Sequence, residues 1–202
     1  MVDPLVLREI RRKSIHVIPG FLAIPFVIRL GRLIALATAL FFLTVYTLNE
    51  ISLRKNLEWK IPIAYNTYVI MARKHELEQR TFIGTVYFWG LTALIIALLP
   101  PEPAAAAIMV SSLGDAAAAI IGRAVPVPSN PLNRRKSFVG SIAMFAVSAL
   151  SCLLVGFNIF GSFIIAFSST IAEALTRKSV NDEITVPVIA AFSSYLVYYY
   201  FS

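Results

Sequence analysis

One carboxylate stands out because it falls inside a strongly apolar stretch. Asp115 lies in segment 103–121, whose other residues are mostly small or apolar. An ionisable side chain is costly to bury in such a segment and usually marks a site or a pathway. Gly114, Ala118 and Gly122 recur every four residues, which by itself indicates close packing of membrane helices. Packing accounts for the small residues but not for the aspartate, so we expect Asp115 to be functional.

A basic cluster precedes the next apolar stretch. Arg134, Arg135 and Lys136 follow a proline-rich loop and lie just before a helix predicted to start at 138. Cations at such a helix end are common membrane anchors on the cytoplasmic side. The same position also suits a phosphate group, because the free N–H groups and dipole of a helix N-terminus attract anions. Charge alone leaves both interpretations open.

Three polar side chains near the N-terminus share one predicted helical face. Glu9, Lys13 and His16 are spaced i, i+4 and i+7, at the entrance to the first apolar stretch. A single histidine is more often structural. On the same face as a lysine and a glutamate it can instead line a polar pocket, and the spacing leaves both roles open.

Further carboxylates lie at the same predicted membrane depth as Asp115. Glu50 closes the second predicted span, Glu173 lies near the end of the sixth, and Asp182 belongs to the last polar turn. Any one of them could simply be solvated. Together they supply the oxygen ligands that magnesium prefers in phosphoryl-transfer sites, so we expect Asp115, Glu173, Asp182 and Glu50 to be metal ligands.

The composition points to a membrane protein. Of 202 residues, 58% are hydrophobic and only 14% are charged, against about 25% charged in an ordinary soluble domain. The net charge of +7 comes from short basic clusters between apolar runs, which favours a membrane over nucleic acid as the partner. The single cysteine, Cys152, excludes a disulfide framework and a cysteine metal site.

Seven apolar stretches approach the roughly 20 residues that a membrane helix needs. They are 14–28, 33–48, 82–99, 103–121, 138–155, 157–175 and 185–201. The polar connection between the second and third contains an apolar segment, 61–72, that is too short to span and is predicted to lie in the interface. We therefore predict an all-α, polytopic integral membrane protein in which residues 1–202 form a single membrane-embedded catalytic domain.

The distribution of basic residues predicts the orientation. With the N-terminus in the cytoplasm, sixteen of the eighteen lysine and arginine residues fall in cytoplasmic segments. Only Arg29 and Arg32 then lie outside. This excess is the pattern of the positive-inside rule, so we expect a cytoplasmic N-terminus and a polar site that faces the cytoplasm.

The segment from Asp115 onwards resembles the CTP-binding signature of the dolichol kinase and phytol kinase family, which includes CTP-dependent diacylglycerol kinases. That signature is aspartate, two residues, alanine, three residues, glycine, three residues, glycine, eight residues, and Lys-Lys-Thr-x-Glu-Gly. Asp115, Ala118 and Gly122 match it, and 135–140 completes it at the same spacing. The departures are Pro126 for glycine, Arg135 for lysine, Ser137 for threonine and Val139 for glutamate. The missing glutamate removes a possible metal or ribose contact.

Three other segments resemble the same family, in the same order along the chain. Residues 9–16 are similar to its first-helix motif, 73–88 to its middle segment, and Glu173 with 181–187 to its ending, where the family's Asp-Asn pair is reversed. Phosphatidate cytidylyltransferases carry a similar aspartate-to-lysine segment. Their typical ending, Gly-Gly, two residues and Asp-Arg-x-Asp, is not found after Glu173.

The resemblance implies a kinase that transfers the γ-phosphate of CTP, with magnesium, to the primary hydroxyl of a membrane alcohol, dolichol or another polyprenol first of all. Lys136 and Arg135 would hold the triphosphate, Asp115 would bind magnesium or accept the alcohol proton, and Lys13 and His16 would hold phosphate or the acceptor. The other predicted nucleotide contacts are Gly122, Gly140, Ala118 and Ser137. Two alternatives stay open, a CDP-lipid synthase and a membrane transporter for a lipid or an anion.

Overall fold

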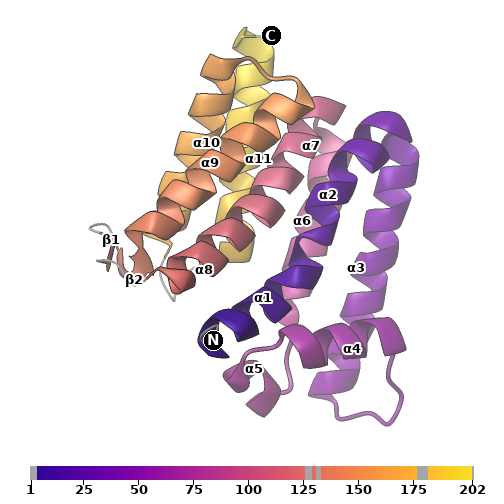
Figure 1. The fold of residues 1–202 in the computed structure, drawn as a ribbon. Helices are drawn as coiled ribbons and strands as arrows, with labels where there is room; N and C mark the ends of the chain where they lie inside the picture. Colours follow the sequence, from indigo (N-terminus) through magenta and orange to yellow (C-terminus); the bar gives the residue numbers. More distant parts are fainter. Residues whose placement is uncertain (1–3, 126–128, 131–132, 177–181, 202) are drawn as a thin grey trace.

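The computed structural model of the protein describes residues 4–125, 129–130, 133–176 and 182–201. Their regular secondary structure is helical apart from one short hairpin, as Figure 1 shows. The chain begins with a bent helical segment made of α1 (Pro4–His16), α2 (Ile18–Ala23) and the π-helical turn η1 (Ile24–Arg29). The predicted all-helical architecture is thus confirmed.

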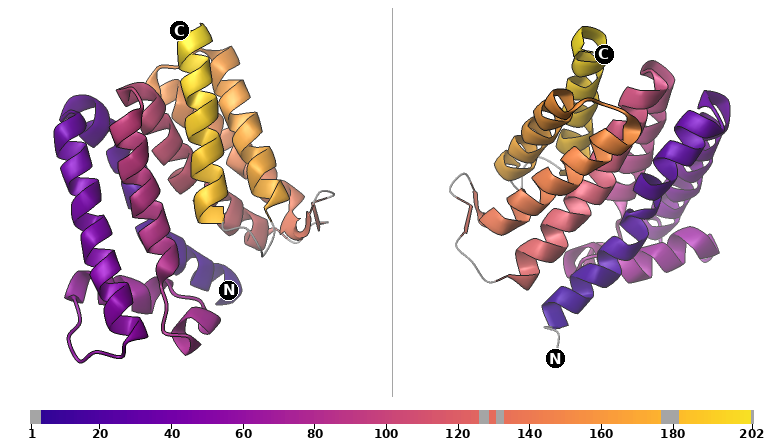
Figure 2. Two further views of the ribbon diagram at one scale, coloured as in Figure 1. Left: turned by 180° about the vertical axis from the view of Figure 1, so that it is seen from behind. Right: turned by 45° about the horizontal axis from the view of Figure 1, so that its top comes forward.

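The other long helices run roughly alongside this segment (Figures 1 and 2). They are α3 (Arg32–Arg54), α6 (Ile83–Leu98), the segment α7 (Pro101–Met109), η2 (Val110–Gly114) and α8 (Asp115–Ala124), then α9 (Phe138–Val155), α10 (Ile159–Leu175) and α11 (Asp182–Phe201). Most predicted boundaries agree within three residues, with two exceptions. The first segment is already helical from Pro4, ten residues before its predicted start. The second helix continues to Arg54, so that Glu50 lies inside α3 rather than at its end.

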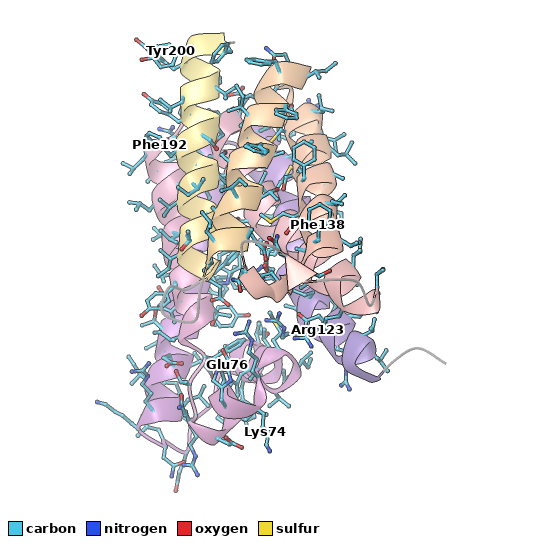
Figure 3. All side chains as sticks on the ribbon, turned by 90° about the vertical axis from the view of Figure 1, so that its left-hand side faces the viewer. Lys74, Glu76, Arg123, Phe138, Phe192 and Tyr200 are labelled. Carbon is cyan, nitrogen blue, oxygen red and sulfur yellow. The ribbon has the colours of Figure 1, made fainter. Side chains whose placement is uncertain are left out.

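Within the described part of the chain, four helices are long and apolar enough to cross a membrane. They are Arg32–Arg54, Pro101–Ala124, Phe138–Val155 and Glu183–Phe201, and Ile83–Leu98 and Ile159–Leu175 are shorter apolar helices. Large apolar side chains such as Phe192 are exposed on the outside of the bundle (Figure 3). These features support an integral membrane protein, whereas the count of seven spans and their orientation remain predictions.

Two short helices lie across one end of the bundle (Figure 1). They are α4 (Pro62–Met71) and α5 (Lys74–Glu78), between α3 and α6. Figure 3 shows that the charged residues Lys74, Glu76 and Arg123 lie at this end, which we call the polar end. The predicted interfacial segment is therefore a helix at the polar end, and its contact with a membrane surface stays a prediction.

The central helix is α7, because its side chains are small enough for others to pack closely on every side. Its four consecutive alanines, 104–107, are at most 1% exposed. The helix begins with Pro101, a residue that suits the first helical turn because its missing N–H would have no partner there. It packs against α2, η1, α9 and α11. This central position brings the following residues, including Asp115, to the middle of the polar end.

A hairpin that the sequence did not predict precedes α9. Strands β1 (Ser129–Asn130) and β2 (Asn133–Ser137) pair antiparallel. The side-chain amide of Asn130 donates to Ser141 Oγ at 2.9 Å, and that of Asn133 donates to the Thr176 carbonyl at 2.9 Å. The hairpin is thus bonded to α9 and to the end of α10, which places Lys136 near both helices. Pro126 and the turn 177–181 lie outside the described residues.

Candidate active site

A π-helical turn positions Asp115. The helix that starts at Pro101 widens at η2, directly before Asp115, and then continues as α8. Such wider turns are rare and occur frequently at functional sites. Gly114 ends η2, and a Cβ atom there would lie 2.6 Å from Ser148 Oγ of α9. Glycine at this position therefore lets α9 approach the turn closely.

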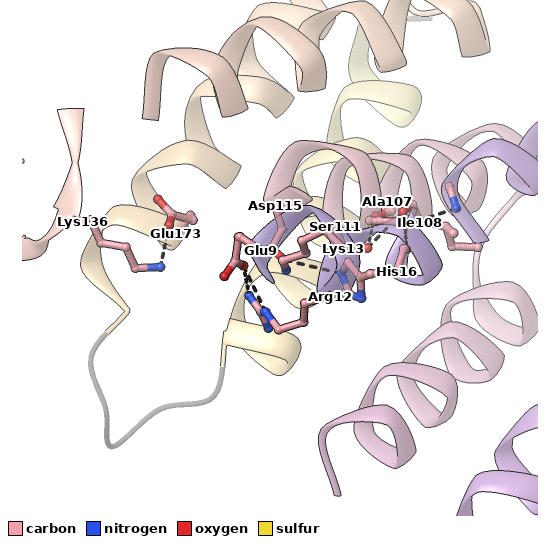
Figure 4. Close-up of polar contacts among 12 residues, drawn as sticks. Glu9, Arg12, Lys13, His16, Ala107, Ile108, Ser111, Asp115, Lys136 and Glu173 are labelled. Atoms are coloured by element: carbon pink, nitrogen blue, oxygen red, sulfur yellow. Dashed lines mark hydrogen bonds and ion pairs between the residues drawn. The ribbon is translucent and has the colours of Figure 1, made fainter. Parts of the chain in front are cut away.

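Asp115 forms an ion-paired cluster with the first helix. Lys13 Nζ contacts Asp115 Oδ2, and His16 Nε2 lies 3.4 Å from the same oxygen. The Lys13 residue is 5% exposed, and the His16 ring packs against Phe88 with centroids 5.2 Å apart. Lys13 and His16 therefore share a face of α1, as their spacing predicts, and that face lies against α8 (Figure 4).

The first helix is bent at this cluster, and a hydroxyl group bridges the break. Pro19 follows the junction of α1 and α2, where a proline lacks an N–H and disturbs the helix. Ser112 Oγ donates to the His16 carbonyl and accepts from the Gly20 N–H at 3.2 Å. The Ser112 hydroxyl thus replaces the direct bond that these two groups would form in a straight helix. The bend and the π-helical turn are joined through one side chain.

Glu9 extends the cluster toward α8. Its carboxylate accepts from Arg12 Nε at 3.0 Å, and its other oxygen lies 3.1 Å from Arg123 Nε. Burial lowers the pKa of Arg12. The hydrogen bond to Glu9 and the nearby carboxylate charges raise it by more than burial lowers it, so the pKa lies above its ordinary value. Arg12 therefore stays charged. Glu9 therefore has a structural role, because its carboxylate pairs with both Arg12 and Arg123.

A second lysine–carboxylate pair lies on the other side of α8. Lys136 Nζ of β2 donates to Glu173 Oε1 of α10 at 2.5 Å, and Glu173 is 4% exposed. Figure 4 shows this pair apart from the Asp115 cluster. Arg135 is part of β2, but its side chain lies outside the described residues. The sequence correctly places Lys136 at the polar end and does not reveal that Glu173 is its partner.

The predicted nucleotide contacts on α8 and α9 lie where these two helices meet. A Cβ atom on Gly140 would lie 2.7 Å from the Ala118 carbonyl and 3.2 Å from the Gly122 Cα. Ser137 accepts a bond from the Gly140 N–H at 3.4 Å and caps α9. Close helix packing and capping therefore account for these residues, while a contact with nucleotide stays a prediction.

Of the predicted metal ligands, the three whose side chains the structure describes make separate contacts. Glu50 accepts from Arg54 Nε at 2.6 Å, from the Thr81 hydroxyl at 2.5 Å and from the Phe82 N–H at 2.5 Å, so it links α3 to the start of α6. The Asp182 side chain lies outside the described residues. Among the described residues, no group of three or more His, Cys, Asp or Glu could hold a metal ion. Asp115 and Glu173 are each paired to a lysine, and a magnesium site that includes them stays a prediction.

An elongated apolar pocket adjoins the Asp115 cluster. Its volume is about 420 Å³, and it lies between the bent N-terminal segment, α3, α4 and α6. Lys13 and His16 line it at the polar end. The rest of the wall is mainly aliphatic and aromatic, including Phe42 and Trp89, whose stacked rings have centroids 4.6 Å apart. The arrangement can hold an apolar chain with a polar head group at Lys13 and His16.

One acidic residue in the wall of the pocket has no counterpart among the predicted site residues. Glu183 of α11 lines the pocket, and a Cβ atom on Gly84 would lie 2.0 Å from Glu183 Oε2. Only glycine fits at position 84 with this carboxylate in place. The signal that could have revealed Glu183 is an acidic side chain beside the start of an apolar helix.

Comparisons with known proteins support a kinase family of the predicted kind. A segment of the chain is 31% identical over 104 residues to a protein of Oryza sativa subsp. japonica described as probable phytol kinase 1, chloroplastic. The match covers 44% of this chain, and the chain spans about a third of that relative's length. No family model matches the chain. No solved structure matches it either.

Proposed function

We propose that this protein is a CTP-dependent kinase of a membrane isoprenoid alcohol, such as dolichol, another polyprenol or phytol. The observation that carries the proposal is the position of the apolar pocket. Its polar end is formed by Lys13 and His16, which both contact the carboxylate of Asp115. A long-chain alcohol bound there would have its hydroxyl among ionisable groups and its tail among apolar ones. The similarity to a probable phytol kinase supports the same class of acceptor.

In the proposed reaction, the alcohol oxygen bonds to the γ-phosphorus of CTP. The bond from that phosphorus to the oxygen bridging the β- and γ-phosphates breaks, and CDP leaves. His16 accepts the alcohol proton, because His16 lines the pocket and Asp115 does not. The Asp115 carboxylate contacts His16 and stabilises the protonated imidazole. Lys13 keeps the Asp115 carboxylate in place.

The nucleotide would approach from the cytoplasm, on the side of the hairpin. Lys136 is the candidate for the triphosphate, together with the neighbouring Arg135, because phosphoryl transfer depends mainly on positioning and on neutralising charge. The Lys136 side chain is 21% exposed and already contacts Glu173. An incoming triphosphate would compete with that carboxylate for the lysine. We expect magnesium to arrive as its complex with CTP.

A labelling experiment tests the proposal. Purified protein in detergent receives magnesium, an isoprenoid alcohol and a lipid phosphate, with CTP labelled either at the γ- or at the α-phosphate. Label that enters lipid only from the γ position supports the kinase. Label that enters only from the α position would show CDP-lipid synthesis instead, and label from neither would return the transporter to consideration.

The assignment of Lys136 has its own test. We expect Lys136→Ala to lower kcat/KM for CTP about 100-fold, because a charge that stabilises the transferring phosphate is lost. The matched control is Lys74→Ala, since the Lys74 side chain is 84% exposed. Among the described residues its one ion pair is with Glu78, with 3.9 Å between Lys74 Nζ and Glu78 Oε1. Full activity of Lys136→Ala would contradict the assignment.

A further inference from the structure

A second pocket lies at the polar end, apart from the apolar one. It has a volume of about 320 Å³ and lies between the end of α3, the loop 55–61, α4 and the segment from α5 to Arg80. Lys60 and Arg80 are its charged lining residues, and no acidic residue of the described chain lines it. The hairpin that carries Lys136 lies away from α4 in Figures 1 and 2. This pocket is therefore a basic site separate from the predicted triphosphate site.

The backbone at Arg80 has a conformation that arginine rarely adopts. Its φ is +49°, in the left-handed region where a side chain is strained and glycine is not. The Thr81 N–H donates to the Glu76 carbonyl at 3.0 Å, and the Arg80 N–H donates to the Leu77 carbonyl at 3.3 Å. This pair of bonds ends a helix on a left-handed residue, a position where glycine is usual. An arginine at such a position indicates a use for its side chain.

Both cations are held at the pocket wall by contacts that leave their charges available. Arg80 Nη1 donates to Asn56 Oδ1, and Asn56 ends α3 in the same left-handed way, with a φ of +50°. A guanidinium group carries five N–H donors, so this bond leaves others for a ligand. Lys60 Nζ lies 4.3 Å from the centre of the Tyr65 ring, which also lines the pocket. Lys60 and Arg80 are both exposed to water.

The carboxylates near this pocket are bonded to other groups. Glu50 and Glu76 lie close to its wall. Both oxygens of Glu50 accept bonds from α3 and from the start of α6, and Glu76 Oε2 accepts from the Arg73 N–H at 2.6 Å. Among the described residues, neither Lys60 nor Arg80 forms an ion pair. A lysine and an arginine that line one pocket without a carboxylate partner suit an anion, and a phosphate group in particular.

Apolar side chains accompany these cations. Leu57, Val69 and Leu77 line the pocket and are 37%, 54% and 42% exposed. Trp59, in the same loop, is 45% exposed, and tryptophan is enriched where a membrane meets water. The predicted orientation places this end at the cytoplasmic leaflet, which carries anionic lipids. We propose that the pocket binds a phosphate group, carried by an anionic phospholipid or present as a free phosphate. The site is independent of the proposed kinase function, because it involves neither the alcohol nor CTP.

Trp59 can report binding at this pocket. Its carbonyl accepts from Ser52 Oγ of the pocket wall, and it directly precedes Lys60. The chain has two tryptophans, so Trp89→Phe leaves Trp59 as the single fluorophore. In detergent at constant ionic strength, pyrophosphate tests the free source, and phosphatidic acid tests the lipid source. Diacylglycerol with the same tails is the match without phosphate.

We expect a saturable fluorescence change with pyrophosphate, with phosphatidic acid or with both, and none with diacylglycerol. The compound that binds identifies the source of the phosphate. No saturable change with either phosphate compound, or an equal change with diacylglycerol, would overturn the proposal.

Arg80→Gly separates binding from folding. Glycine adopts the left-handed conformation without strain, so we expect this variant to melt no lower than its parent. Its affinity for the phosphate compound should fall about tenfold or more, because a charge-assisted contact is lost, and Lys60→Gln should have a similar effect. Lys55→Gln is the matched control, since it removes a charge from the same loop at a position that does not line the pocket. Unchanged affinity in Arg80→Gly, or equal losses in Lys55→Gln and Lys60→Gln, would overturn the assignment.

Discussion

At the scale of single residues, each lysine of the site pairs with one carboxylate from a distant part of the chain. Lys13 and Asp115 are 102 positions apart in the chain, and Lys136 and Glu173 are 37 apart. A buried ion pair adds little net stability, because desolvation of both charges offsets their attraction, yet removing one partner leaves the other charge buried and unpaired. Such pairs are weak evidence for stability and stronger evidence for a site.

Removing the Asp115 pair in two steps separates its structural role from its functional one. We expect Asp115→Leu to lower the free energy of unfolding by about 3–5 kcal/mol, because Lys13 is left buried without its partner. The double variant Lys13→Met, Asp115→Leu should recover most of that loss, because both charges are gone. Phosphate transfer should fall by 10²-fold or more in both variants.

Thermal unfolding in detergent and the γ-label assay provide the two measurements. An active double variant would show that the pair is only structural. If Asp115→Leu is as stable as the wild type, Lys13 does not remain buried and unpaired when Asp115 is removed.

At the scale of elements, small residues bring α8 and α9 into contact. Gly122 and Gly140 face each other there, and the Ala118 carbonyl lies against Gly140. The same contact joins the helix that carries Asp115 to the one that follows Lys136. Close packing at this point therefore holds the two lysine–carboxylate pairs at one end of the molecule, even if no glycine contacts the nucleotide.

Alanine substitutions of two helical glycines test the role of this contact. We expect Gly140→Ala to cost about 1–3 kcal/mol of unfolding free energy, because its Cβ would lie 2.7 Å from the Ala118 carbonyl. Gly90→Ala is the control, since its Cβ would meet only Leu43 Cδ1 at 3.7 Å, and alanine favours a helix more than glycine does. Melting temperature and CTP affinity are measured for both. Loss of CTP affinity at unchanged stability would favour the nucleotide role of Gly140.

At the scale of the whole molecule, charge and apolar surface are separated along the helix bundle. Lys74, Glu76 and Arg123 lie at the polar end, whereas Phe192 and Tyr200 project from the remainder of the bundle (Figure 3). This arrangement suits a protein whose lipid partner arrives from the side and whose charged partner arrives from water. It predicts that the polar end faces the cytoplasm, where basic residues concentrate.

Single cysteines test this orientation. In a Cys152→Ser background, which removes the one native cysteine, Lys55→Cys reports on the polar end and Leu30→Cys on the opposite end. Both positions are exposed. In intact cells we expect a membrane-impermeant maleimide to label position 30 only, and to label position 55 after the membrane is permeabilised. The reverse pattern would contradict a cytoplasmic site.

The sequence by itself determined the helices, the apolar class and several of the polar residues that meet. Local patterns suffice there, because a helix depends on near neighbours and on the apolar run that it can bury. The shared face of Glu9, Lys13 and His16 follows from spacing alone. The resemblance to a kinase family likewise depends only on residue types in order.

Only the tertiary structure decided which charges are partners. Asp115 contacts Lys13, Glu173 contacts Lys136, and Glu50 joins α3 to α6 instead of joining Asp115. Spacing cannot predict such contacts, because they depend on how helices from distant parts of the chain pack. The same reason applies to the apolar pocket, because its walls come from helices in separate parts of the chain: the bent segment, α3, α4 and α6.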